Sequence, residues 1–135
     1  MDPRAAAEVF GSGAPITLVP LDATNYVPVT MEFTRRLKRD RTTSVAEFVY
    51  RVLAAQEEYV HLGSYYFWDP LAAAITTEEG LGTFQEISLI VVKEEGAESG
   101  RTLESERGSI IRVAIKADRE RFEALFLDAV NGRLP

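Results

Sequence analysis

The amino-acid sequence predicts a mixed α/β fold, on three observations. Residues 84–93 form an apolar, β-branched stretch that is typical of a buried strand. Residues 109–117 alternate between apolar and polar side chains, as a strand with one buried face does. Apolar residues recur at helical spacing over residues 44–60 and 119–130. The length of 135 residues fits a single compact domain, so we expect residues 1–135 to form one domain.

The composition excludes several classes of protein. Hydrophobic residues make up 46% of the chain and charged residues 27%, as in ordinary globular proteins. The net charge of −6 argues against binding to nucleic acid, which requires a basic surface. No apolar run approaches the roughly 20 residues that span a bilayer, and the absence of cysteine excludes disulfides and thiolate zinc sites. We therefore expect a cytoplasmic protein that binds neither nucleic acid nor membrane.

The N-terminal third is predicted to contain a helix, a strand and a second helix. Asp2 is expected to cap the first helix, because Asp followed by Pro is favoured where a helix begins. Residues 16–21 predict a strand, and residues 22–25 predict a polar loop after it. A second helix is expected from Thr30 to Arg39.

The helical pattern that follows is the longest in the chain. Ser44-Val-Ala-Glu47 has the spacing of a capping box, in which two side chains bond to the free amides of the first turn. Its apolar residues fall on one stripe, which we expect to face the core: Val45, Phe48, Val49, Val52, Leu53, Tyr59 and Val60. Gly63 is expected to end it.

Four consecutive aromatic residues, Tyr65–Trp68, precede Asp69 and form the principal candidate site. The simplest interpretation is that Asp69 caps a helix over residues 71–77. However, four aromatic side chains are costly to leave in a loop unless they line something. A carboxylate beside aromatic surface can bind a metal or hydroxyl groups while the rings stack on a planar group. The residues alone leave open whether this is a ligand pocket or a loop that fills the core.

Two other residues are weaker candidates. Asp22 follows a predicted strand, and ligands collect at the carboxyl ends of strands in open α/β sheets. It can equally satisfy the backbone of a turn. His61 ends a predicted helix, where a hydrogen-bond donor is favoured by the exposed carbonyl groups, and no Ser or Cys arrangement near it indicates catalysis.

The C-terminal part predicts an antiparallel hairpin and a last helix. Residues 94–100 are a charged, glycine-bearing turn, and residues 101–106 can form a short return strand. Asp118 is expected to cap the last helix. The core stripe of that helix is predicted to consist of Phe122, Leu125, Phe126, Ala129 and Val130.

Three separated blocks of the sequence resemble the nucleoside hydrolase family. Residues 2–10 and 13–24 resemble the segment that follows the substrate-binding asparagine of that family. Residues 66–74 resemble a later active-site motif, His-Asp-Pro or Trp-Asp-Pro, and residues 99–102 resemble the region near the C-terminus. The resemblance covers essentially the whole chain. It implies the C-terminal portion of a Rossmann-like fold, with a few strands, an antiparallel hairpin and packed helices.

The resemblance implies a chemistry and a set of site residues. The family cleaves the N-glycosidic bond of ribonucleosides, with a calcium ion that holds the ribose hydroxyls and the attacking water. By resemblance, Asp69 is the metal ligand and Trp68 stacks on the departing base, with a preference for purines. Tyr65 and Tyr66 are expected to contribute to substrate binding on the base side.

The sequence departs from the family at its signature, Asp-x-Asp-x-x-x-Asp-Asp. It contains neither Asp-x-Asp nor Asp-Asp. One carboxylate with waters binds calcium weakly, and the positioned base is also missing. We therefore expect this chain alone not to hydrolyse nucleosides. Three interpretations stay open: a silent C-terminal fragment, one subunit of a split hydrolase that an N-terminal segment completes, and a non-catalytic assembly or regulatory domain.

The resemblance also implies an oligomer. Part of a larger sheet exposes a strand edge and apolar surface, and both favour self-association. We expect a homo-oligomer, most simply a two-fold dimer.

Overall fold

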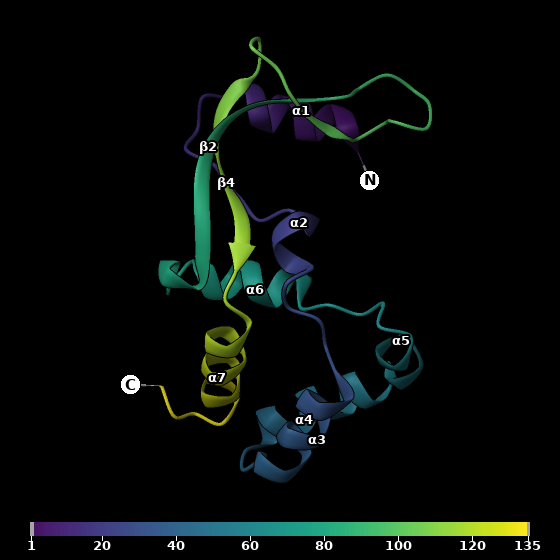
Figure 1. Ribbon diagram of the computed structural model, residues 1–135, viewed down its shortest axis with the longest axis vertical. Helices are drawn as coiled ribbons and strands as arrows, with labels where there is room; N and C mark the ends of the chain where they lie inside the picture. The colour runs from purple at the N-terminus through teal and green to yellow at the C-terminus, as the bar shows by residue number, and fades with distance from the viewer. Residues whose placement is uncertain (1, 135) are drawn as a thin grey trace. The chain divides into compact units, whose positions relative to one another are not determined.

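The computed structural model describes residues 2–134 and confirms the mixed α/β fold (Figure 1). The helices are α1 (Pro3–Gly11), α2 (Leu21–Thr24), α3 (Met31–Asp40), α4 (Ser44–Ala54), α5 (Glu57–His61), α6 (Trp68–Ile75) and α7 (Arg119–Val130). The strands are β1 (Thr17–Leu18), β2 (Gly82–Val91), β3 (Thr102–Glu104) and β4 (Ser109–Ala117), and η1 (Glu79–Leu81) is a 3-10 turn. Over this range, none of the helices has the length and apolar content that crossing a bilayer requires.

The chain folds as two compact units. The first consists of Met1–Pro20 with Phe84–Ile115, and the second of Leu21–Thr83 with Lys116–Pro135. Each unit is built from segments distant in the sequence. The prediction of one domain over residues 1–135 stays a prediction.

The first unit is built around a four-stranded sheet in the order β1-β4-β2-β3. β1 runs parallel to β4, with Thr17 opposite Arg112. β2 and β3 are antiparallel, with Leu89 opposite Glu104, which confirms the predicted hairpin. The apolar core of the sheet consists of Leu89, Ile111 and Val113, with Phe10, Ile16, Leu18 and Ile87 packed against them.

The segment after α1 differs from the prediction. The strand expected over residues 16–21 is only two residues long, and the loop expected over residues 22–25 is the short helix α2. Pro20 has no N–H group and cannot extend the ladder with β4. The next residues form the single helical turn α2, in which the Asn25 N–H donates to the Leu21 carbonyl at 2.8 Å.

Gly108 is predicted to be intolerant of a side chain. It ends the turn that Ser105 begins, and a Cβ at this position would lie 2.6 Å from the backbone of Leu89 in β2. We expect Gly108→Ala to lower the free energy of unfolding by about 1–3 kcal/mol, because the strand backbone must shift. Gly11→Ala is the matched control, since its Cβ meets nothing within 4 Å. Equal unfolding midpoints in urea for the two variants would contradict this prediction.

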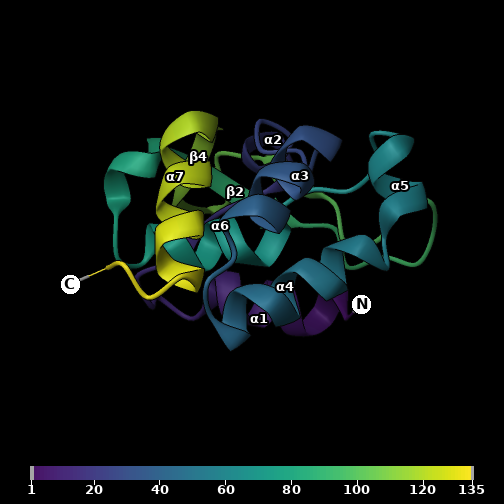
Figure 2. The ribbon, with the colours of Figure 1, turned by 90° about the horizontal axis from the view of Figure 1, so that it is seen from below.

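The second unit packs helices around four phenylalanine rings. The ring centroid of Phe67 lies 5.0 Å from that of Phe33, 5.2 Å from that of Phe122 and 5.1 Å from that of Phe126. Phe33 lies in α3, Phe67 lies directly before α6, and Phe122 and Phe126 lie in α7. The helix α7 contacts both α3 and α6 (Figure 2). Phe33, Phe67 and Phe122 are buried. The aromatic cluster therefore anchors the start of α6.

The predicted capping box of α4 is wrong, and the predicted core stripe is confirmed only in part: Leu53 and Val60 are buried, whereas Val45, Phe48, Val52 and Tyr59 are exposed. The helix is capped by Thr43, whose hydroxyl accepts from the Ala46 N–H at 3.0 Å. The residues that α4 buries are Ala46 and Leu53, whereas Phe48 is 67% exposed. α4 contacts α3 and α7 through a narrow face, so the adjacent apolar stripe faces solvent. Helical periodicity therefore identifies the apolar stripe of a helix, but it does not show which side of that helix other segments will cover.

Two of the predicted aspartate caps are confirmed. The Asp2 carboxylate accepts from the Arg4 and Ala5 N–H groups at 3.1 and 3.0 Å. The Asp118 carboxylate accepts from the Arg121 N–H at 3.1 Å. Both side chains therefore satisfy amides that the first helical turn leaves free.

Candidate functional site

The candidate site begins with a short backbone pairing inside the second unit. The Val29 N–H donates to the Tyr65 carbonyl at 2.9 Å, and the Phe67 N–H donates to the Val27 carbonyl at 3.1 Å. Between these bonds, Pro28 lies opposite Tyr66 in an antiparallel bridge. Val27, Val29 and Phe67 are buried. This pairing fixes the backbone that leads into Trp68.

This backbone pairing is not among the features predicted from the sequence. Val27 and Val29 are β-branched residues two positions apart, and such residues point to the same side of an extended segment. That spacing is the only local sign of an extended segment here. The paired segment around Tyr66 lies about forty residues further along the chain, so only the tertiary structure reveals the pairing.

Three aromatic rings of the predicted site lie together. The Trp68 ring meets Tyr65 edge to face, with centroids 5.3 Å apart and an interplanar angle of 79°. It meets Tyr66 in a tilted arrangement, at 6.0 Å and 45°. Both tyrosines are half-buried, whereas Trp68 is 37% exposed. The two tyrosines therefore support an indole that solvent still reaches.

Asp69 is not the helix cap that the sequence predicted. α6 begins at Trp68, and Phe67 at the cap position makes no side-chain cap bond. Asp69 therefore lies inside the first turn, where a negative charge is favoured by the helix dipole. Its side chain is exposed, and it has no hydrogen bond or ion pair with any residue between 2 and 134. The Asp69 carboxylate is therefore exposed and unpaired, one residue after Trp68 in the chain.

The remaining candidates do not complete a metal site. Asp22 is exposed in the first turn of α2, which packs against α6. His61 is the exposed last residue of α5. Over residues 2–134 no three His, Asp or Glu side chains gather as metal ligands would. Because calcium takes six to eight oxygens, the described residues do not by themselves fit a calcium ion.

The comparisons with known proteins agree on one family. Residues 1–124 match the family model described as inosine-uridine preferring nucleoside hydrolase. A stretch of 81 residues is 37% identical to Nucleoside hydrolase 3 of Arabidopsis thaliana, covering 55% of this chain and 9% of that protein.

Two solved structures are similar over almost the whole chain. The inosine-uridine preferring nucleoside hydrolase from Bacillus anthracis is 28% identical, with a TM-score of 0.83 over 98% of this chain and 42% of that one. The purine-preferring ribonucleoside hydrolase from Gardnerella vaginalis is 29% identical, with a TM-score of 0.76 over 97% and 44%. The chain thus spans less than half the length of these relatives. Because the family model matches residues 1–124, the chain belongs to the inosine-uridine preferring nucleoside hydrolase family.

Proposed function

We propose that this chain forms the base-facing wall of a nucleoside hydrolase active site. The observation that carries the proposal is the exposed Trp68 indole, supported by Tyr65 and Tyr66 and followed directly by the unpaired Asp69 carboxylate. An indole stacks on a purine ring and stabilises it by ring contact. If another segment completed a calcium site here, Asp69 would contribute one of its carboxylate oxygens.

We propose further that the chain needs carboxylates from another segment for catalysis. The sequence has no Asp-x-Asp or Asp-Asp, and residues 2–134 gather no three metal-ligating side chains. Without a positioned base, the roughly hundred- to ten-thousand-fold contribution of general base catalysis is lost. The chain alone is then silent. Completed by a segment that carries the aspartate cluster, it contributes binding of the base and one metal ligand.

The test is inosine, guanosine and uridine cleavage with calcium, by the chain alone and mixed with an N-terminal nucleoside hydrolase segment that carries the aspartate cluster. We expect free base only from the mixture. Turnover by the chain alone would refute the need for added carboxylates. The absence of turnover from both samples, in spite of complex formation, would instead favour a non-catalytic assembly role.

Variants at Trp68 and Asp69 test the inherited site in that mixture. We expect Trp68→Ala to weaken nucleoside binding about three- to tenfold, from the loss of stacking, and Trp68→Phe to restore part of it. We expect Asp69→Asn to weaken calcium binding at least about tenfold. Glu120→Gln is the control for Asp69, because it is an exposed acid in the first turn of α7. Normal calcium affinity in Asp69→Asn would remove Asp69 from the metal site.

We also propose that the chain forms a homodimer through the exposed face of α4. Val45, Phe48 and Val52 lie at helical spacing and are 56%, 67% and 42% exposed. Burying them against a second copy removes apolar surface from water. Light scattering after size exclusion is expected to give a dimer for the native chain and a monomer for Phe48→Glu. A native monomer at high protein concentration would contradict the proposal.

A further inference from the structure

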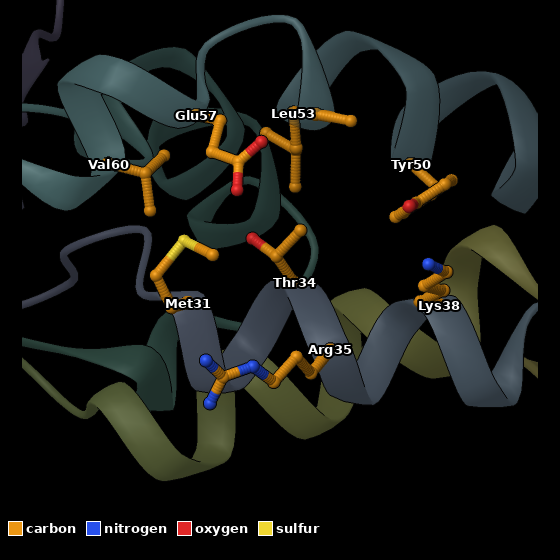
Figure 3. A pocket seen from close by; sticks show the side chains of 9 residues that line it. Met31, Thr34, Arg35, Lys38, Tyr50, Leu53, Glu57 and Val60 are labelled. Carbon is orange, nitrogen blue, oxygen red and sulfur yellow. The ribbon is translucent and has the colours of Figure 1, made fainter.

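A cavity lies between α3, α4 and α5, apart from the residues of the candidate site (Figure 3). Its volume of about 340 Å³ lies at the lower end of the range for small-molecule pockets. All of its lining residues belong to the second unit. None of them is among Tyr65–Asp69.

The cavity has an apolar end and a cationic end. Met31 and Val60 point into the cavity at one end, and Lys38 and Tyr50 face each other at the other (Figure 3). Leu53 is buried between them. The Lys38 ammonium lies 5.8 Å from the centroid of the Tyr50 ring. An elongated ligand with one apolar end and one anionic end would match both ends.

The cationic end is conspicuous in an acidic protein. Residues 35–41 carry five of the fifteen lysines and arginines of the chain, which has a net charge of −6. Arg41 is paired with Glu47, whereas Lys38 forms no ion pair with any residue from 2 to 134. The Lys38 charge is therefore available to an anionic group.

A carboxylate enters the cavity from the opposite wall. The Glu57 side chain points from α5 into the space between the two ends, across from Thr34 on α3 (Figure 3). The Thr34 hydroxyl donates to the Thr30 carbonyl at 3.1 Å, so its oxygen remains free to accept. Glu57 forms no ion pair within the described part of the chain. Two acceptors therefore face the middle of the cavity.

We propose that this cavity binds a small zwitterion with an apolar body, the chemistry of an apolar α-amino acid. The ligand carboxylate meets Lys38, its ammonium meets Glu57 and Thr34, and its side chain lies against Met31, Leu53 and Val60. A simple carboxylate is repelled by Glu57, and a simple amine is repelled by Lys38. A ligand that carries both charges satisfies both walls.

L-leucine serves as the probe in an NMR titration, with N-acetyl-leucine and leucine amide as matched analogues. Small ligands of this size bind weakly, so the titration extends to about 10 mM. We expect saturable shifts at the amides of Thr34, Leu53 and Val60, and at least about fivefold weaker binding of each analogue. The absence of shifts, shifts centred elsewhere, or equal affinities for leucine and both analogues would overturn the proposal.

Paired variants assign the two charges. We expect Lys38→Gln and Glu57→Gln each to weaken leucine binding at least about fivefold. The controls are Arg39→Gln and Glu58→Gln, which are exposed neighbours on the same helices that do not line the cavity. If the control variants weakened leucine binding equally, the effect would reflect the overall charge of the surface, and the proposed site would be refuted.

The analogues sharpen this assignment. In Glu57→Gln, leucine and N-acetyl-leucine are expected to bind with equal affinity, because the carboxylate that favours an ammonium group is gone. In Lys38→Gln, the affinities for leucine and leucine amide are expected to become equal, because the ammonium that favours a carboxylate is gone. Unchanged discrimination in both variants would overturn the assignment. Unfolding midpoints equal to that of the native chain exclude a loss of folding as the cause.

Discussion

Replacement of Phe67 by alanine is expected to lower the free energy of unfolding by about 3–5 kcal/mol. Phe67 is 2% exposed, and its ring meets those of Phe33, Phe122 and Phe126 at 5.0–5.2 Å. Truncation removes apolar burial and leaves a cavity that three rings from α3 and α7 cannot fill by small movements. Because a domain is stabilised by about 5–15 kcal/mol in total, this loss is a large part of its stability.

Phe48→Ala is the matched control for this experiment. It deletes the same atoms from a side chain that is 67% exposed on α4. Its effect is expected to remain within about 0.5 kcal/mol. Urea unfolding of both variants at a concentration where the chain is monomeric gives the comparison. A Phe67→Ala loss below about 1 kcal/mol, or equal losses in the two variants, would show that the aromatic cluster is not the core of this unit.

Asn131→Ala is expected to cost about 2–3 kcal/mol, although it removes little apolar surface. The Asn131 side-chain oxygen accepts from the Thr42 N–H at 2.8 Å and from the Thr42 hydroxyl at 2.9 Å. Its amide nitrogen donates to the Leu127 carbonyl at 2.9 Å, and the residue is 6% exposed. Truncation removes all three of these hydrogen bonds, each of which contributes about 1 kcal/mol net.

Asn25→Ala is the control, because Asn25 is exposed and its side chain has no buried hydrogen-bond partner among residues 2–134. Its effect is expected to remain within about 0.5 kcal/mol. Amide hydrogen exchange adds a local measurement, since exchange of the Thr42 N–H is expected to become faster in Asn131→Ala. Unchanged protection of Thr42 would contradict the role of Asn131 in joining the end of α7 to the loop before α4.

The candidate site was partly visible in the sequence. The adjacency of Tyr65, Tyr66, Trp68 and Asp69 is local, so the sequence placed these residues together. The sequence assigned Asp69 a capping role that the structure does not support, since α6 begins one residue earlier. Where the helix begins depends on Phe67, which is held by Val27 and by the aromatic core. Those partners are distant in the sequence.

The sequence by itself determined the mixed α/β class, the hairpin, the caps at Asp2 and Asp118, and the resemblance to nucleoside hydrolases. Each of these depends on patterns within a few residues, such as periodicity, turn composition or a short motif. Local patterns report how a segment can fold and which of its faces is apolar.

Only the tertiary structure decided which apolar faces are covered. It placed Phe48 in solvent and Leu53 in the interior, although both belong to the same apolar helix. It also brought Lys38 and Glu57 to opposite walls of one cavity. The physical reason is that burial is decided by packing between segments, and packing partners are set by the whole chain and not by the spacing within one element.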